Sequence, residues 1–300
     1  MSTTDKQPGD ASLFFRYASM FACPICTTPM QLVQGKSLVC ARRHCFDMAK
    51  TGYISLLVRS PKSKYDKSLF KARNAVNAAG VFDPLLDRIS EGMQERIVSQ
   101  TGSIKMLDAG CGEGSHLSRI LNRLAGQAPA IDWLGVGVDL SKEGIRLAVR
   151  ENVQAIWCAA DLARCPFADK QFDFVLSICS PSNYAEFGRM LADEGTVIKA
   201  VPASGYLREL RELLYRETAR QDYSNERVVE RFGRYFDLID TERVTYKAAM
   251  DPLLLEQIVQ MTPLAWGAPQ ELVREATAER FAEITFDFDI MYGKQPRRDQ

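Results

Sequence analysis

The stretch Leu107-Asp108-Ala109-Gly110-Cys111-Gly112-Glu113-Gly114 decides the fold of this chain. It connects residues 104–107, an apolar segment that reads as a strand, to residues 115–124, which have the periodicity of an amphipathic helix. Glycine allows a sharp turn between the two elements and a close approach of the backbone to a bound molecule. We therefore expect this turn to border a site for a nucleotide-type ligand.

The spacing of the glycines distinguishes two kinds of ligand. Dinucleotide sites carry Gly-x-Gly-x-x-Gly, with the pyrophosphate at the N-terminus of a helix. Here the third glycine, Gly114, comes one residue early, and Glu113 lies inside the loop. A carboxylate is a poor neighbour for pyrophosphate but suits the cationic methionine end of S-adenosylmethionine. The loop therefore favours S-adenosylmethionine over a dinucleotide.

Two carboxylates follow later strand-like segments. Asp139 comes 27 residues after Gly112, where a carboxylate can accept hydrogen bonds from both ribose hydroxyls. Asp139 could instead be a simple helix N-cap or a strand-end turn. Asp161 follows the next strand and could receive the adenine amino group, although Asp-Leu after a strand is common in loops.

Helix and strand patterns alternate on both sides of the glycine-rich turn. Helices are expected over residues 84–98 and 207–220. The segments expected as strands are 104–107, 133–138, 155–158, 172–178, 196–200, 243–246 and 284–292. This alternation predicts an α/β fold over residues 80–300, in which a mostly parallel sheet carries helices on both faces. Together with the glycine-rich turn, it indicates a Rossmann-like methyltransferase domain.

A second motif lies near the start of the chain, where Cys23 and Cys26 are followed by Cys40 and by either His44 or Cys45. Zinc in structural sites binds four thiolate or imidazole ligands in a tetrahedron, and the spacing alone does not separate the two candidates for the fourth ligand. Because nothing in the sequence directs secretion, zinc binding explains these cysteines better than disulfides do. A segment this small needs the metal to hold its fold together.

Composition limits the class of protein. The chain has 300 residues, 46% of them hydrophobic and 25% charged, as in a globular enzyme. Its 38 basic and 38 acidic residues argue against a general nucleic-acid coat protein but leave room for a local basic patch. No apolar run approaches about 20 residues, and the N-terminus is polar, so we expect no membrane span and a cytoplasmic location.

The domain boundaries follow from these patterns. We predict a flexible N-terminal tail over residues 1–19. Its first part, residues 1–11, is polar and reads as disordered, after which Leu13, Phe14, Phe15 and Tyr17 could dock on the body. A zinc-binding module follows over 20–58, a basic linker or helix over 59–79 and the methyltransferase domain over 80–300. The basic segment is either a solvated linker and helix face or an RNA contact. Its basic residues are Arg59, Lys62, Lys64, Lys67, Lys71 and Arg73.

Other polar residues near these motifs have plainer interpretations. His116 follows the glycine-rich loop, and we interpret it as a helix-surface residue. Cys111, Cys158, Cys165 and Cys179 are scattered along apolar segments and read as inert small hydrophobic residues.

The order of motifs resembles the bacterial 23S ribosomal RNA guanine-N1 methyltransferases. The resemblance rests on Cys-x-x-Cys, on Cys-x-x-x-His-x-Phe-Asp-x-Ala-Lys-x-Gly-Tyr, on Asp-x-Gly-Cys-Gly-Glu-Gly and on Met261-Thr262-Pro263-Leu264-Ala265-Trp266, and it runs from about residue 21 to residue 292. The family implies a class I methyltransferase domain behind an N-terminal zinc-binding module, with S-adenosylmethionine and zinc as cofactors. It also implies a target guanine in a 23S RNA hairpin near the peptide exit tunnel, with one branch linked to macrolide-type antibiotic resistance. The sequence leaves open the branch and whether the chain forms a homodimer.

The resemblance also suggests site residues. It favours His44 over Cys45, so that the zinc ligands would be Cys23, Cys26, Cys40 and His44. It implies that Gly112 and Glu113 contact the cofactor, that the aromatic ring of Phe82 packs against it, and that Tyr206 occupies a polar contact position. The cofactor-binding residues we predict are Phe82, Asp108, Gly110, Gly112, Glu113, Gly114, Asp139, Asp161 and Tyr206.

The residue that removes the N1 proton is not evident from the sequence. Ser180 and Pro181 either line the pocket of the target base or form an ordinary turn, and no Asp, Glu or His beside them identifies a base. Water could serve instead. Two other functions stay open at this point: a methyltransferase of a small molecule or protein with a structural zinc, and a zinc-dependent RNA-binding assembly factor without catalysis.

Overall fold

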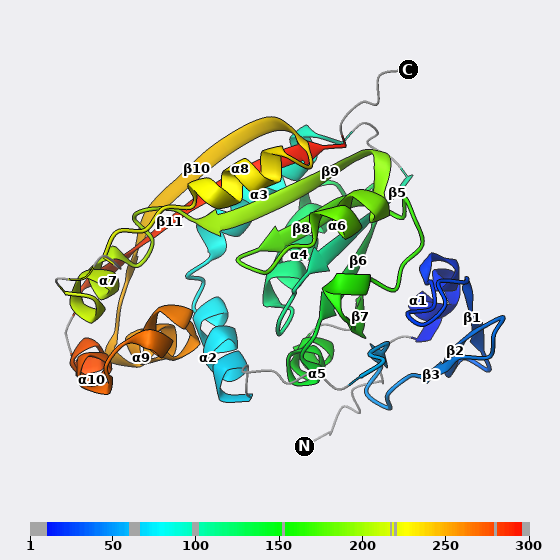
Figure 1. Cartoon of the computed structure of the whole chain (residues 1–300), viewed down its shortest axis with the longest axis horizontal. Coiled ribbons are helices and arrows are strands. Elements are labelled where there is room, and N and C mark those ends of the chain that lie inside the picture. The colour runs from blue at the N-terminus through cyan, green and yellow to red at the C-terminus, as the bar shows by residue number, and fades with distance from the viewer. Residues whose placement is uncertain are drawn as a thin grey trace.

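The computed structural model of the chain describes residues 11–59, 67–97, 102–151, 154–216, 218, 221–278 and 281–295. Within these residues, eight strands form one sheet in the order β10-β11-β9-β8-β5-β6-β7-β4. Strand β11 pairs antiparallel with both β9 and β10, and all the other neighbouring strands pair in parallel. The strands are β4 (Ile54–Ser55), β5 (Gly102–Ala109), β6 (Ile131–Asp139), β7 (Ala155–Ala159), β8 (Phe172–Ile178), β9 (Leu191–Pro202), β10 (Asp237–Ala249) and β11 (Glu283–Lys294). The expected α/β fold with a mostly parallel sheet is confirmed (Figure 1).

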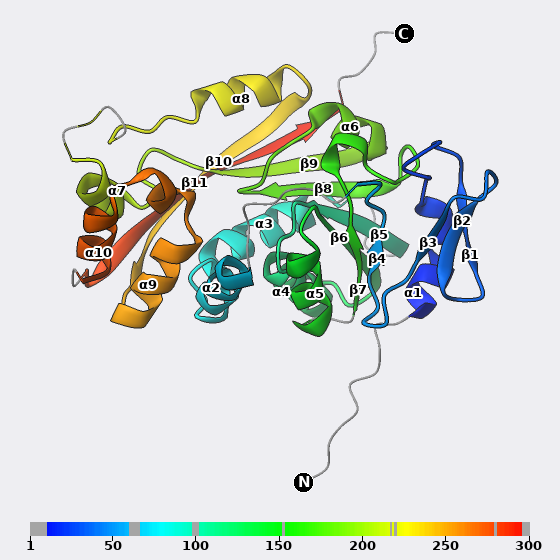
Figure 2. The ribbon, with the colours of Figure 1, turned by 60° about the horizontal axis from the view of Figure 1, so that its bottom comes forward.

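Helices cover both faces of this sheet. On one face lie α3 (Asp83–Glu95), α4 (Ser115–Gln127) and α5 (Lys142–Glu151), and on the other α6 (Tyr184–Met190) and α8 (Glu226–Gly233), as Figure 2 shows. Strand order reverses on either side of β5, and ligands of such sheets bind beyond the carboxyl ends of the strands at that point.

One end of the sheet carries a separate helical layer. It contains α2 (Lys67–Ala78), α7 (Arg208–Leu214), α9 (Pro252–Met261) and α10 (Gln270–Ala278), together with the short helix η3 (Pro263–Gly267). Helix α2 packs against α9 and also contacts α4 and α5. This layer therefore brings the chain before β5 and the chain after β10 to the same end of the sheet (Figure 2).

The N-terminal module is a three-stranded antiparallel sheet of β1 (Met30–Val33), β2 (Ser37–Cys40) and β3 (Cys45–Asp47). Its core is continuous with that of the large sheet, because buried Met20 and Phe21 belong to the same apolar cluster as Val136 and Phe167. Strand β4 then joins the large sheet beside β7. The module is thus fused to one face and one edge of the large sheet.

Residues 11–19 differ from the flexible tail that we expected. They contain helix α1 (Ala11–Arg16) and lead into the short helix η1 (Ala18–Met20). Phe14 is 2% exposed and stacks on Phe21, whereas Phe15 is 76% exposed. Burial of one aromatic ring thus anchors this segment. The docking that we expected is confirmed for Phe14 and wrong for Phe15.

The glycine-rich turn ends where packing leaves no room for a side chain. Gly114 has φ +81° and stands at the N-cap of α4. A Cβ there would lie 2.5 Å from the ring of the buried Trp157 on β7. Glycine is therefore required both by the backbone conformation and by the close contact of loop and strand.

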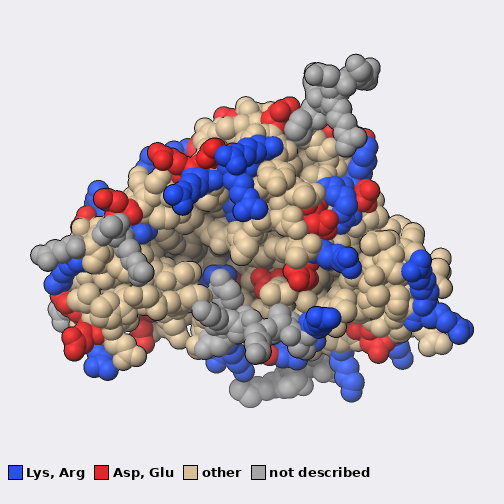
Figure 3. Space-filling view, in the orientation of Figure 1, with Lys and Arg blue, Asp and Glu red and all other residues tan. Residues whose placement is uncertain are grey.

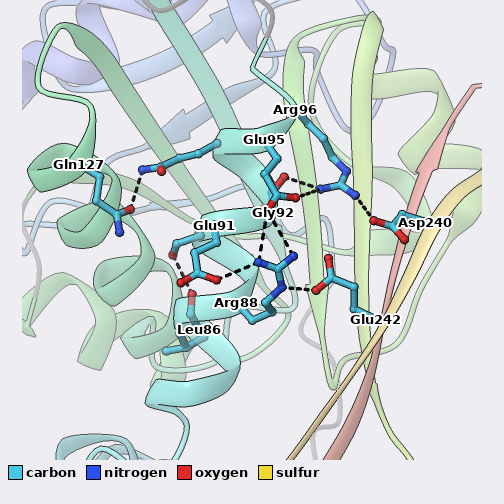
Figure 4. A network of polar contacts seen from close by, with 11 residues as sticks. Leu86, Arg88, Glu91, Gly92, Glu95, Arg96, Gln127, Asp240 and Glu242 are labelled. Atoms are coloured by element: carbon cyan, nitrogen blue, oxygen red, sulfur yellow. Dashed lines mark hydrogen bonds and ion pairs between the residues drawn. The ribbon is translucent and has the colours of Figure 1, made fainter.

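Polar contacts hold α3 to the antiparallel edge of the sheet (Figure 4). The guanidinium of Arg88 donates to Glu242 of β10, and Arg96 donates to Asp240 across 2.5 Å. Arg96 also lies over the ring of Tyr292, 3.7 Å from its centroid. This network orients the helix that begins next to Phe82.

The helix expected over residues 207–220 is shorter in the structure, since α7 covers only Arg208–Leu214. The late strands are longer than expected. Strand β10 is an edge strand that buries little, so most of it lacks the apolar pattern that marks a strand in a sequence. None of the described helices has the length and apolarity needed to cross a membrane.

Candidate functional site

The zinc-ligand candidates converge within the N-terminal module. The ligand atoms of Cys23, Cys26, Cys40 and His44 all lie within 4.8 Å of one another. His44 Nδ1 lies 3.4 Å from the Sγ atoms of both Cys23 and Cys40. Three thiols and one imidazole in a partly buried cluster fit the closed tetrahedral site of a structural zinc.

Cys45 lies outside this cluster. Its side chain is exposed, and its Sγ lies 3.7 Å from Oδ1 of Asp47. The alternative that the sequence left open between His44 and Cys45 is thus resolved spatially, because only His44 joins the three cysteines.

A cavity of about 530 Å³ lies beyond the carboxyl ends of β5, β8 and β9. We call it the principal cavity because it adjoins the glycine-rich loop. On one side it is lined by Gly110 and Glu113 of the glycine-rich loop and by Phe82. On the other side it is lined by Ser180 and Pro181 of the segment after β8. Its volume is that of a site for a small molecule or cofactor.

The acid of the loop is held in place from α2. Glu113 is buried, and its Oε1 accepts a hydrogen bond of 3.0 Å from Asn77 Nδ2. Burial raises the pKa of Glu113, and the positive charge of Arg73 opposes that rise. Arg73 also lines the cavity, with Nη1 3.0 Å from where a Cβ on Gly112 would be.

Arg73 thus differs from the rest of the basic segment. We expected the whole segment to be either a solvated face or an RNA contact, but helix α2 turns Arg73 onto the glycine-rich loop. Lys67 and Lys71 are exposed on the same helix, and Lys62 and Lys64 lie outside the described residues.

Asp139 supports the loop from the end of β6. Its Oδ2 accepts a hydrogen bond from the amide of Gly112 (2.9 Å), and its Oδ1 accepts one from the amide of Ser141 (2.7 Å). The strand-end turn that we considered for this residue is therefore present. Two of the carboxylate's four lone-pair positions are used, which leaves acceptor capacity for a ligand.

Asp108 adds a third acid to this region. It is 2% exposed, and burial together with the charges of Asp139 and Glu113 raises its pKa to about 8. Burial also raises the pKa of Asp139. Three neighbouring acids with raised pKa values describe a site that a cationic ligand would stabilise.

Phe82 and Tyr206 both line the cavity, as does His116. His116 is therefore not the helix-surface residue that we expected: its ring packs edge-on against Phe82, with the centroids 5.1 Å apart. Burial and the charges of Arg73 and Arg119 lower the pKa of His116 to about 3, so the ring is neutral. The periodicity of α4 alone places His116 on the helix surface, but Phe82, in the segment before α3, packs over the His116 ring.

Asp161 lies elsewhere. It is exposed, and its Oδ1 accepts a hydrogen bond of 2.8 Å from the amide of Ala163. It lines a second cavity, of about 390 Å³, together with Leu140 and with Ile25 and Val58 of the N-terminal module. The structure does not bring Asp161 into the principal cavity with Glu113.

The segment after β8 closes over the glycine-rich loop. Ser180 Oγ donates a hydrogen bond of 2.6 Å to the carbonyl of Ala109, and a Cβ on Gly110 would lie 2.6 Å from Ser180 Cβ. Cys179, which we interpreted as an inert small hydrophobic residue, has φ +50° and is exposed at the cavity. A tight turn at the mouth of the cavity explains its exposure.

Further cavity residues were not found by sequence reasoning. Lys199 is a lysine inside the apolar strand β9, and this position was the one signal that could have drawn attention to it. Tyr223 precedes α8, and Arg227 and Arg231 lie on that helix. These side chains come from segments that carry no recognisable motif.

Comparisons with known proteins agree with this arrangement. The model of the RlmA N-terminal zinc ribbon matches residues 21–64, and a methyltransferase-domain model matches residues 106–195. A Bacillus subtilis protein, YxjB, provisionally named a 23S rRNA (guanine-N(1)-)-methyltransferase, is 44% identical over 278 residues, which are 92% of this chain and 97% of that protein.

A second relative has a more specific name. The 23S rRNA (guanine(748)-N(1))-methyltransferase of Streptomyces fradiae is 30% identical over 265 residues, covering 87% of this chain and 90% of that protein. With a zinc-ligand cluster in place, a methyltransferase sheet behind it and relatives that match both parts, the chain belongs to the 23S rRNA (guanine-N1)-methyltransferase family.

Proposed function

We propose that this protein transfers the methyl group of S-adenosylmethionine to N1 of a guanine in 23S ribosomal RNA. The observation that carries the proposal is one cavity that is lined both by Gly110 and Glu113 of the glycine-rich loop and by Ser180 and Pro181 of the segment after β8. One compartment can therefore hold a methyl donor and an acceptor base side by side. The names of the relatives supply the class of acceptor.

The cofactor site is assembled from the loop and its supports. Glu113 would bind the ammonium of the methionine moiety, and Arg73 would bind its carboxylate from α2. Asp139 would accept hydrogen bonds from the ribose hydroxyls, and the adenine of the cofactor would extend toward Leu140 and Asp161. Phe82 and Tyr206 would enclose the cofactor, while Asp108, Gly110, Gly112 and Gly114 shape the loop. When bound, S-adenosylmethionine supplies an electrophilic methyl group on a cationic sulfur.

The protein's contribution to such a displacement is mainly alignment of the two reactants. Guanine N1 lies on the Watson–Crick edge, so the base must be unpaired before it enters the cavity. Tyr223 and Pro181 line the cavity near the segment after β8, where the target base would lie, and both have rings that a base can pack against. Stacking on such side chains is how single-stranded bases are held.

A basic surface borders the entrance of the cavity. Arg227 and Arg231 of α8 line the cavity, and together with Arg234 they line the adjoining groove. In Figure 3, which has the orientation of Figure 1, Lys and Arg side chains gather over α8 with acidic side chains beside them, and Glu230 also lines the groove. We propose that this surface and the zinc module of residues 20–58 hold the RNA while the domain of residues 80–300 carries out the transfer.

Transfer of a radiolabelled methyl group in vitro tests this function. The substrate is 23S RNA, free or in ribosomal subunits, from cells that lack the protein, and the product is digested to nucleosides for mass spectrometry. The proposal expects label in 1-methylguanosine. Label in another nucleoside, in protein or in a small molecule, or no transfer at all despite binding of the cofactor, would contradict it.

A further inference from the structure

Lys199 is a buried amine at the acceptor side of the cavity. It lies in the middle of β9 between Ile198 and Ala200, which are fully buried, and its own exposed fraction is 4%. Its side chain nevertheless lines the cavity together with Ser180 and Gly110. Lysine is almost never buried to this extent unless a partner compensates its charge.

The polar contacts of Lys199 leave its charge uncompensated. Nζ donates to Ser177 Oγ across 3.0 Å and to the carbonyl of Ser180 across 2.5 Å. Both acceptors are neutral, and among the described residues no carboxylate lies within ion-pair distance of Nζ. An ammonium has three donors, so one remains for a ligand. A buried cation with neutral partners favours a ligand atom that carries negative charge.

The position of Lys199 relative to the cofactor loop is set by Ser180. The carbonyl of Ser180 accepts from Lys199, and its hydroxyl donates to the carbonyl of Ala109 at the end of β5. The amine therefore lies next to the point where the segment after β8 meets the glycine-rich loop. An atom of the base held against this point is close to the reacting centre.

We propose that the ammonium of Lys199 donates a hydrogen bond to O6 of the target guanine and stabilises the anion that forms when N1 loses its proton. This inference rests on the proposed function, because O6 is the oxygen that shares the charge of N1. The N1 proton passes to water. The electron pair of N1 then forms the bond to the methyl carbon, the carbon–sulfur bond breaks, and its pair remains on sulfur. The products are neutral 1-methylguanine and the neutral thioether.

The protonation of the surrounding groups allows this role. Burial lowers the pKa of Lys199 to about 8, so the cation predominates at neutral pH. Desolvation at the cavity wall raises the pKa of Cys179 to about 11, and burial raises the pKa values of Tyr184, Tyr206 and Tyr223. His116, with a pKa of about 3, stays neutral. Across the cavity lie the permanent charges of Arg73, Arg227 and Arg231 and the carboxyl of Glu113.

The same contacts allow a simpler role, in which Lys199 only fastens the turn after β8. The two roles differ in their dependence on pH. A cation that stabilises the guanine anion matters most where Lys199 is charged, and its benefit disappears as pH rises through the pKa of the amine. If Lys199 only stabilises the turn after β8, its replacement changes the rate by the same factor at every pH. A neutral amine acting as the base would gain importance as pH rises.

Single-turnover methyl transfer under saturating S-adenosylmethionine separates these roles. The variants are Lys199→Met, Lys199→Gln and Lys199→Arg, with Lys247→Met as a control on the exposed face of β10, and the range runs from about pH 6.5 to about pH 9.5. We expect Lys199→Met to lose about 100-fold in rate at the lowest pH, by analogy with loss of an oxyanion donor. The deficit should shrink above about pH 8, where the wild type loses its charge.

Lys199→Arg, which keeps the charge at every pH, should be faster than Lys199→Met and Lys199→Gln at low pH, with unchanged cofactor affinity in each. A rate deficit that is constant or grows with pH, or an arginine variant no faster than the methionine variant, would overturn the proposal. If the wild type itself transfers no methyl group to 23S RNA, it is the proposed function that fails.

Discussion

The main-chain amide of Gly112 donates a hydrogen bond to Oδ2 of Asp139 across 2.9 Å. The end of β6 therefore sets the conformation of the loop after β5, and the two strands act together in forming the site. Since Oδ1 accepts from Ser141, the same carboxylate also begins the turn into α5. A single residue thus orders the two loops between which the cofactor would lie.

Glu113→Gln should weaken the binding of S-adenosylmethionine by about 10- to 100-fold, because it replaces a charged acceptor of the ligand ammonium by a neutral one. S-adenosylhomocysteine carries the same ammonium and should be affected equally. Isothermal titration calorimetry of both ligands measures this effect. Glu143→Gln, on the exposed surface of α5, is the matched control. Equal affinities in Glu113→Gln and the wild type would remove Glu113 from the site.

Asp108→Asn should stabilise the ligand-free protein, and increasingly so as pH rises. The pKa of Asp108 is raised to about 8 by burial and by neighbouring acids, so the folded state holds the proton more tightly than the unfolded chain does. The associated stability is present below the unfolded pKa and is lost as pH rises toward about 8. The advantage of the variant should grow by up to about 1.4 kcal/mol per pH unit between about pH 4 and that value.

Denaturant unfolding of the zinc-loaded protein across this pH range checks the prediction. Asp132→Asn, at a surface ion pair with Arg16, reports the effect of a carboxyl-to-amide change away from the site. An advantage of Asp108→Asn that stays constant with pH would contradict the pKa assigned to Asp108.

Removal of zinc should unfold the N-terminal module and disturb the sheet to which it is fused. His44→Ala and Cys40→Ser should lose the metal, whereas Cys45→Ser should keep one zinc ion per chain, because its thiol lies outside the cluster. Metal analysis by mass spectrometry measures the content, and circular dichroism follows the fold during chelation. Loss of zinc from Cys45→Ser with retention in His44→Ala would reverse the assignment.

Reversing the charge of Arg227 and Arg231 should weaken RNA binding and reduce its dependence on salt. Each phosphate contact that is lost lowers the slope of log K against log salt by about 0.7 to 0.9. Binding of the RNA substrate by Arg227→Glu/Arg231→Glu at several salt concentrations measures the slope. Lys142→Glu/Arg146→Glu on α5, across the sheet from α8, is the control (Figure 2). An unchanged slope would place the RNA elsewhere.

The two motifs could be predicted from sequence because each is local. Short spacings place Cys23 and Cys26 on one turn, and the run of glycines before a helix specifies the loop at Gly112. Residues that reach the site through packing gave no such signal. Arg73 arrives because α2 folds back onto the loop, and Lys199 was hidden in an apolar strand. Asp161 follows a strand as expected, but it lines a different cavity from Glu113, one formed in part by the N-terminal module. The sequence around Asp161 carries no sign of that contact.

Primer extension on 23S RNA tests the central claim most directly. A methyl group on guanine N1 blocks Watson–Crick pairing, so reverse transcriptase should stop one nucleotide before the modified base. RNA from cells with the protein should show one strong stop at a guanine in an unpaired position. That stop should vanish in cells lacking the protein and return with the wild-type gene. Identical extension patterns with and without the protein, along the whole large-subunit RNA, would contradict the account.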